Sequence, residues 1–210
     1  MANDERTGLG LRPLNQPYGT FRVNYYRANT AVNMFRFQPV ALNNSGQVQV
    51  KSIADMSGML GVIVGFLDAS KGSLPSDMTS LSLGAYLRSG NDSFVAVADD
   101  PNQEFVIEAD TGGGTIGSLN SAGQTISFVY QNGTTTDGNV TTGIANVLLD
   151  SSTTATSTAG ILTLVRPFDR VNQDGTINSP GNFEKWVVYI NSHQKGPLNQ
   201  GPGGALGLPG

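Results

Sequence analysis

The densest group of side chains able to do chemistry in this sequence is a run of carboxylic acids. The run contains five residues: Asp99, Asp100, Glu104, Glu108 and Asp110. Two carboxyl groups flanking a glycosidic bond can hydrolyse it, one as acid and the other as base or nucleophile. Acids clustered on the polar faces of a hairpin are more commonly solvated. We therefore keep glycoside hydrolysis as the weaker interpretation and a solvated turn as the stronger one.

The last of these acids begins a protease-like triplet. Asp110-Thr111-Gly112 matches the triplet of aspartic proteases, whose chemistry needs two carboxylates about 3 Å apart, supplied by two lobes or two subunits. Glu108-Ala109 stands where those enzymes carry an apolar run. We interpret the triplet as a turn at the end of a strand.

A glycine spacing that resembles a nucleotide-binding loop overlaps the triplet. Gly112, Gly114 and Gly117 have the G-x-G-x-x-G spacing. Dinucleotide binding also needs a helix directly after the loop, so that the pyrophosphate meets the helix N-terminus. Residues 118–123 form a poor helix because they are rich in Ser, Asn and Gly. The segment is interpreted as a flexible glycine turn.

A calcium-loop pattern near the C-terminus fails on its key ligands. Asn172, Asp174 and Gly175 match the middle of an EF-hand loop. The first ligand position is Arg170, a cation, and the twelfth is Gly181 instead of a bidentate glutamate. Asp174-Gly175 is therefore predicted to be a turn, and no metal site is expected there.

The remaining catalytic residue types are scarce. The chain has no cysteine and one histidine, His193, so thiolate sites and a two-histidine metal site within one chain are excluded. No serine lies in the nucleophile-elbow motif of hydrolases. We predict no enzyme activity, no cofactor and no metal, and we interpret His193 as a hydrogen-bonding surface or interface residue.

Charge is sparse and uneven along the chain. Charged residues make up 13% of the sequence and the net charge is −4. Residues 1–36 hold five arginines and two acids, whereas residues 90–150 hold eight acids and neither Lys nor Arg. This disfavours nucleic acid as a partner because no dense basic patch exists. It allows a basic arm to lie on an acidic surface, with ordinary solvated faces as the alternative.

Hydrophobic periodicity predicts a mainly β fold. Segments of alternating or continuously apolar residues, separated by Gly, Asn and Asp turns, are typical of strands. They are residues 21–25, 35–37, 48–50, 59–67, 94–97, 105–109, 126–130, 147–149, 161–165 and 183–190. The segment 59–67 carries two glycines and predicts a buried strand with a bulge. We expect a single β-barrel or β-sandwich body, with a hairpin or tight corner at Asp99-Asp100-Pro101-Asn102.

Both ends of the chain lack this periodicity. Residues 1–20 contain Gly and Pro without a hydrophobic period and predict an extended arm, and residues 195–210 form a Gly/Pro-rich tail. The expected organisation is therefore an arm at 1–20, a β body at 21–194 and a tail at 195–210. Residues 150–160, almost all Ser, Thr and Ala, predict a polar turn, with a short helix as the alternative.

The sequence predicts neither secretion nor membrane insertion. No apolar run follows the charged start of the chain, as a secretion signal would require. The longest apolar stretch, 59–67, is much shorter than the roughly 20 residues that span a bilayer. We expect a soluble protein made in a host cytoplasm without a signal peptide.

Three segments resemble small head proteins of tailed bacteriophages that decorate, or cement, the capsid. They are Gly10-Leu11-Arg12-Pro13-Leu14, Asp99-Asp100-Pro101-Asn102 with 105–110 after it, and Val188-Tyr189-Ile190-Asn191-Ser192-His193-Gln194. Their order and spacing fit that family and span most of the chain. The tail after Lys195 extends beyond the family pattern.

The resemblance implies a body that assembles as a homotrimer on the outside of a phage head. The partner would be the major capsid protein, and decoration would stabilise the contacts between its subunits. The arm would lie on the capsid protein and add a strand to it. The residues expected to bind the capsid are Leu9, Leu11, Arg12, Pro13, Leu14 and Tyr18.

Two other classes of function remain open at this point. One is a different virion component, such as a tail or fibre-base protein. The other is a β-sandwich carbohydrate-binding module, which needs exposed aromatic residues on one face. Tyr25, Tyr26 and Trp186 are the candidates for such a face.

Overall fold

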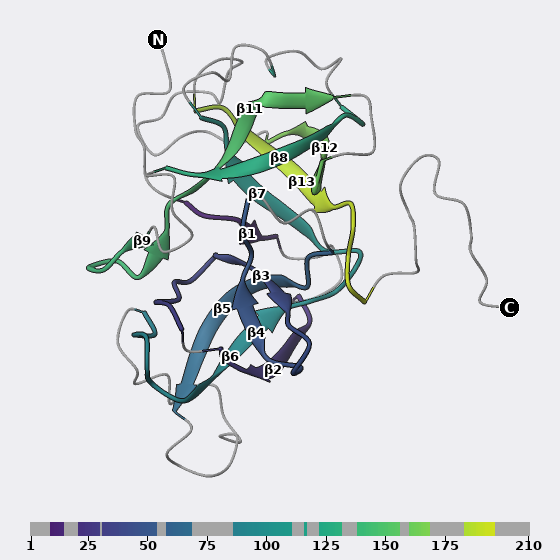
Figure 1. The fold of residues 1–210 in the computed structure, drawn as a ribbon. Helices are drawn as coiled ribbons and strands as arrows, with labels where there is room; N and C mark the ends of the chain where they lie inside the picture. The colour runs from purple at the N-terminus through teal and green to yellow at the C-terminus, as the bar shows by residue number, and fades with distance from the viewer. Residues whose placement is uncertain are drawn as a thin grey trace, which may run out of the picture.

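In the part of the chain that it describes, the computed structural model is built of β-strands. The described residues are 9–14, 21–29, 31–53, 58–68, 86–110, 116, 122–131, 138–155, 160–168 and 183–195. Every regular element among them is a β-strand. Figure 1 shows these strands in two sheets, one above the other. The predicted mainly β, sandwich-like fold is confirmed.

The larger sheet has six antiparallel strands and is called the large sheet below. In spatial order it consists of β1 (Arg12–Pro13), β7 (Glu104–Glu108), β13 (Lys185–Ile190), β12 (Leu162–Pro167), β8 (Thr125–Tyr130) and β11 (Val147–Ala155). A bridge between Ala109, just after β7, and Leu149 of β11 connects strands that are not neighbours in this order. The sheet therefore curls around the side chains on its inner face.

The smaller sheet has five antiparallel strands and is called the small sheet. In order it consists of β2 (Val23–Arg27), β6 (Ser93–Ala98), β5 (Gly61–Asp68), β3 (Pro39–Leu42) and β4 (Val48–Val50). A bridge between Ala28 and Val48 brings the two edge strands together at one point. A short hairpin, β9 (Gly138–Asn139) with β10 (Ile144–Ala145), lies beside the sheets.

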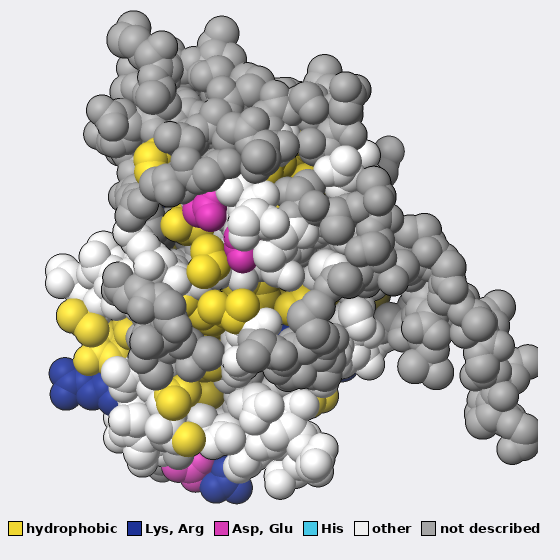
Figure 2. All heavy atoms as spheres, turned by 45° about the horizontal axis from the view of Figure 1, so that its top comes forward, with side chains coloured by type: hydrophobic (Ala, Val, Ile, Leu, Met, Phe, Trp, Pro, Cys, Tyr) yellow, Lys and Arg dark blue, Asp and Glu magenta, His cyan; other side chains and the backbone are white. Residues whose placement is uncertain are grey.

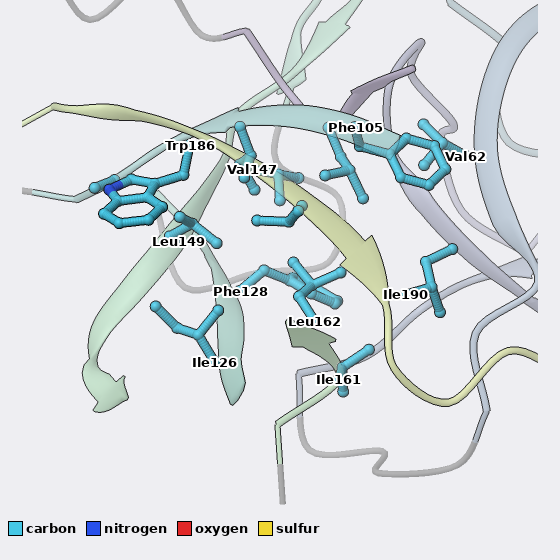
Figure 3. Close-up of a cluster of buried hydrophobic side chains, with 14 of the residues drawn as sticks. Val62, Phe105, Ile126, Phe128, Val147, Leu149, Ile161, Leu162, Trp186 and Ile190 are labelled. Atoms are coloured by element: carbon cyan, nitrogen blue, oxygen red, sulfur yellow. The ribbon is translucent and has the colours of Figure 1, made fainter. Parts of the chain in front are cut away.

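Each sheet covers its own hydrophobic cluster. Figure 3 shows side chains of the larger cluster pointing toward one another from β8, β11, β12 and β13, among them Phe128, Leu149 and Trp186. Val62 of β5 and Met59, just before that strand, also belong to this cluster. Val50 packs against both clusters. The two sheets therefore meet through apolar contacts, whose removal from water is the main favourable term in folding.

The predicted buried strand with a bulge is confirmed in β5. Its pairing with β6 shifts register between Ile63 and Gly65, as a bulge requires. Gly61 begins the strand where no side chain fits, because a Cβ atom there would lie 2.1 Å from the carbonyl oxygen of Ala98. Glycine at this position lets the backbones of β5 and β6 approach closely.

The Ser/Thr/Ala segment differs from its prediction. Strand β11 continues through Ala155, so residues 150–155 are neither a turn nor a helix. Ala155 pairs with Thr125 after a register shift, and the Thr153 hydroxyl accepts the amide hydrogen of Ser127 at 3.0 Å. β-Branched threonines suit a strand once a neighbouring strand is present. Residues 156–159 lie outside the described part of the chain.

The start of the predicted arm belongs to the body. Leu11 is completely buried in the larger cluster, and its amide donates to the Phe37 carbonyl at 2.9 Å. The adjacent residues form β1, which pairs with β7 at the edge of the large sheet. An edge position tolerates Pro13, which has no amide hydrogen. The extended arm predicted for 1–20 therefore does not describe residues 9–14, whereas residues 1–8 and 15–20 lie outside the described part.

Gly10 explains why this short segment fits against the body. Its φ is 60°, a left-handed conformation that glycine adopts without strain. A Cβ atom at this position would lie 2.7 Å from the Cβ atom of Phe37. The glycine thus allows the backbone to turn and Leu11 to enter the core.

Replacing Leu11 by alanine tests whether residue 11 is a core residue or part of a free arm. We expect the free energy of unfolding to fall by about 2–5 kcal/mol, because the variant leaves a cavity in a packed core. The measurement is urea denaturation followed by fluorescence of the buried Trp186. Leu14→Ala is the matched control, since Leu14 is only half-buried. Equal unfolding midpoints for the two variants would contradict the burial of Leu11.

Candidate functional site

A corner of the chain between β6 and β7 connects the two sheets. Strand β6 of the small sheet ends at Ala98, and β7 of the large sheet begins at Glu104. Between them, the Asp100 carboxylate accepts the amide hydrogen of Asn102 at 2.9 Å, and the Asp100 carbonyl accepts that of Gln103 at 3.0 Å. The turn predicted from the Asp-Asp-Pro-Asn sequence is therefore a tight corner. We call residues 99–103 the corner.

Asp99 is the fully buried carboxylate of the corner. It accepts the two hydrogen bonds of the Asn24 amide at 2.8 and 2.9 Å, one from the Tyr26 hydroxyl and one from the Lys195 ammonium group at 2.5 Å. Asn24 and Tyr26 are two residues apart on β2, so they project from the same face of the strand. A buried charge is tolerated when it is paired and hydrogen-bonded in this way.

The electrostatics of this cluster favour the ionised pair. Burial opposes the charge of Asp99, but the hydrogen bonds from Lys195, Tyr26 and Asn24 outweigh it and lower the pKa of Asp99. Burial likewise opposes the charge of Lys195, and the bonds to Asp99 and Tyr26 raise its pKa. The pKa of Tyr26 is raised by burial and by its bond to Asp99. The ammonium nitrogen also lies 5.1 Å from the centre of the Tyr26 ring, a cation–π distance.

The residues just before Lys195 are attached to the small sheet. Met59 donates its amide hydrogen to the Ser192 carbonyl at 2.8 Å and accepts that of Gln194 at 2.9 Å. The side-chain amide of Gln194 pairs with the backbone of Leu42 at 2.7 and 3.3 Å. After β13 the chain therefore leaves the large sheet and is hydrogen-bonded to the small one.

His193 is a half-buried part of this attachment. Its Nδ1 accepts the amide hydrogen of Lys195 at 2.9 Å, which places the proton of the neutral ring on Nε2. Burial lowers the pKa of His193, and Lys195 acts in the same direction. The charges of Asp99 and Asp100 and the Leu60 carbonyl oppose this effect. In this arrangement His193 orders the backbone between the sheets.

The same corner holds the N-terminal segment. The Gln103 side-chain amide donates to the Leu14 carbonyl at 2.5 Å, and the Leu14 amide donates to the Glu104 carbonyl at 2.9 Å. Lys195 is bound to Asp99, four residues before Gln103. The corner is therefore the place where segments near both ends of the chain are attached to the body.

The residues predicted to bind a capsid do not form one exposed surface. Leu9, Arg12, Pro13 and Leu14 are half-buried, and Leu11 is fully buried. Tyr18 lies outside the described residues. Because Leu11 is in the core of its own chain, a partner could contact only the half-buried residues beside it.

The acids of the 99–110 run have separate surroundings in the structure. Asp99 is in the corner, Glu104 and Glu108 lie at the two ends of β7, and Glu104 pairs with Arg166 at 3.5 Å. Asp110 accepts a hydrogen bond from the Ser151 hydroxyl at 2.6 Å. Within the described residues, no three His, Cys, Asp or Glu side chains are grouped to hold a metal ion.

Other motifs of the sequence are either buried or outside the described ranges. The glycines at 112, 114 and 117 and the calcium-like segment 170–181 lie outside them. Of the aromatic residues considered for sugar binding, Trp186 is fully buried and Tyr26 is bound to Asp99. Within the described residues there is no helix long and apolar enough to span a membrane.

No protein-family model matches the chain, and no curated protein matches it.

Sequence reasoning missed the partners of Asp99. Asn24 and Tyr26 lie more than 70 residues before Asp99 in the sequence and Lys195 lies 96 residues after it, and all three look like ordinary surface residues. One signal was present, because Asn24 and Tyr26 are two residues apart on an alternating segment and therefore share one face of a strand. The alternation pattern shows that the two share a face, but it does not show what that face meets.

Replacing Asp99 by alanine tests the corner as a stability determinant. The variant leaves Asn24, Tyr26 and Lys195 without their shared acceptor. We therefore expect the free energy of unfolding to fall by about 3 kcal/mol. Asp92→Ala is the matched control, because its pair with Arg27 is more than half exposed and should contribute little. Urea denaturation of both variants measures the difference. Similar losses of unfolding free energy in the two variants would show that Asp99 stabilises the fold no more than an exposed ion pair does.

The corner should also make stability depend on pH. The lowered pKa of Asp99 contributes stability above its unfolded value of about 3.9, and this is lost as the pH falls through the folded value. The raised pKa of Lys195 contributes below its unfolded value of about 10.4, and this is lost as the pH rises through the folded value. The difference in unfolding free energy between the native chain and Asp99→Ala, measured from pH 2 to 11, should therefore be largest between these limits. A difference that does not change with pH would exclude the ionised pair.

Proposed function

We propose that this chain is a viral structural protein that decorates the capsid of a tailed bacteriophage. It would bind the outer surface of the head through the major capsid protein and stabilise the contacts between capsid subunits. The proposal starts from the resemblance of residues 10–14, 99–110 and 188–194 to that family. It includes a homotrimeric assembly, location in the virion, and no enzymatic activity.

One structural observation supports it best: both end segments are attached to the body at one corner. Residues 9–14 are held by strand pairing with β7 and by Gln103, and Lys195 is held by Asp99. A protein that reinforces a shell has to pass load between its attached ends and its body. Backbone hydrogen bonds and a buried, paired charge are suited to that task because they break together.

The corner also connects the two sheets directly. A force on either end segment reaches residues 99–103, which join β6 to β7 without an intervening flexible loop. The body then resists as a unit, because apolar side chains of both sheets share the larger cluster. Such a body would suit a clamp that is present in many copies, where each copy binds weakly and several attachments act together.

The alternatives have less support. A tail or fibre-base protein would use the same features, and localisation within the virion distinguishes it from a head protein. A carbohydrate-binding module loses its best aromatic residue, because Trp186 is fully buried in the hydrophobic core. A protein that binds sugars by stacking needs such a ring at the surface.

Co-sedimentation with phage heads assembled without this chain tests the proposal. We expect the full chain to saturate the heads, and expect the variant Leu14→Ser/Tyr18→Ser to bind at least tenfold more weakly. Leu11 is retained in this variant, since its removal would damage the core. Val140→Ser removes an exposed apolar side chain on the β9–β10 hairpin and serves as the control. Absence of binding by the full chain, or localisation in the tail, would overturn the proposal.

A further inference from the structure

Two arginines on adjacent backbone segments, Arg12 and Arg36, lack an acidic partner among the described residues. Arg12 of β1 and Arg36 lie on backbone segments joined by the hydrogen bond from the Leu11 amide to the Phe37 carbonyl, 2.9 Å long. Neither guanidinium forms an ion pair with any carboxylate of the described chain. By contrast, Arg27 pairs with Asp92 and Lys195 pairs with Asp99.

The surroundings hold both side chains in place. The Arg12 guanidinium lies 5.0 Å from the centre of the Phe37 ring, and its Nε donates to the Leu9 carbonyl at 3.1 Å. The Arg36 backbone is hydrogen-bonded on both sides, to Gly143 at 2.8 Å and to Ala145 at 2.9 Å. Its Nη2 donates to the Thr142 carbonyl at 2.8 Å. Two cations are therefore held on adjacent backbone segments, where like charges repel each other.

Several N–H donors of this pair remain available. A guanidinium carries more donors than the one side-chain hydrogen bond that each of these arginines makes to the protein. The Nε atom of Arg36 is buried and has no hydrogen-bond partner. Buried donors without a partner are rare in folded proteins and call for an explanation. Because this Nε is closed to solvent, a bound group would be held by the remaining terminal N–H groups of the two guanidiniums.

The electrostatics point to the same kind of ligand. The pKa of Arg12 is lowered, first by burial and then by repulsion from Arg36. The neighbouring residues 142–145 contain no acid that relieves this repulsion. An anion between the two side chains would remove it, and planar guanidiniums bind the oxygens of carboxylates and phosphates in pairs.

We infer that Arg12 and Arg36 form a binding site for an oxyanion, presented at the junction of β1, residues 36–37 and the β9–β10 hairpin. Its ligand is a carboxylate or phosphate group supplied by another molecule. In Figure 2 the Lys and Arg side chains of the face shown lie at its margins, outside a central band of hydrophobic side chains. The inference does not rest on the capsid proposal, because the isolated chain suffices to test it.

Thermal unfolding of the full chain at constant ionic strength tests the site, with malonate or inorganic phosphate replacing chloride. We expect the midpoint to rise and level off as the anion saturates the site. In Arg12→Gln and Arg36→Gln we expect the apparent affinity to fall at least tenfold. Arg27→Gln is the matched control, because Arg27 already has a carboxylate partner. Preference for malonate would identify a carboxylate ligand, and preference for phosphate would identify a phosphate ligand.

A second measurement guards against general salt effects and unstable variants. Phosphate stabilises many proteins by exclusion from their surface, so an increase that does not saturate and is equal in all variants would overturn the inference. In the unmodified chain, the Nε–H resonances of Arg12 and Arg36 should shift on titration with the same anions, and that of Arg27 should not. Unmoved Arg12 and Arg36 resonances would also overturn it. Capsid binding can fail while these shifts persist, which separates this site from the proposed function.

Discussion

The buried carboxylate of Asp99 is the constraint on which much of this structure depends. A charge removed from water has to be paired and hydrogen-bonded, or it is neutralised. Asp99 meets this requirement with groups from β2 and from the segment that follows β13. The corner that carries it is therefore stabilised both by β2 of the small sheet and by the segment around Lys195.

The N-terminal segment is coupled to the same region by a different force. Leu11 is buried in the larger cluster, and the segment beside it adds a strand to β7. Apolar burial holds this end, whereas charge pairing holds the other. The two forces respond differently to pH, because protonation of Asp99 or deprotonation of Lys195 breaks the ion pair while leaving apolar burial largely intact. If the protein fastens a shell, its two ends would keep their attachment under different conditions.

The distribution of charge gives the molecule its chemical character. Among the described residues, Arg27, Arg166 and Lys195 each form an ion pair with one acid. Arg12 and Arg36 are left as a half-buried couple. A folded chain tolerates such a couple at a cost in stability, and the cost is removed when a ligand supplies the opposite charge. This is the physical reason to look for an anionic partner at that surface.

Most of the longer strands, the bulge in β5 and the corner could be recognised from the sequence, because side-chain alternation and turn residues act locally. The strand predicted at residues 35–37 is wrong, since Arg36 forms only an isolated bridge and Phe37 a turn with a φ of 63°, and β3 begins at Pro39. The core position of Leu11 and the strand at 150–155 could not be recognised in this way. A single leucine has no periodicity, and Ser/Thr-rich segments become strands only when a neighbour pairs with them. The partners of Asp99 were equally hidden, since they come from β2 and from residue 195. Local patterning determined the class of fold, and contacts between distant segments, which no local pattern encodes, decided where each charge and each chain end is held.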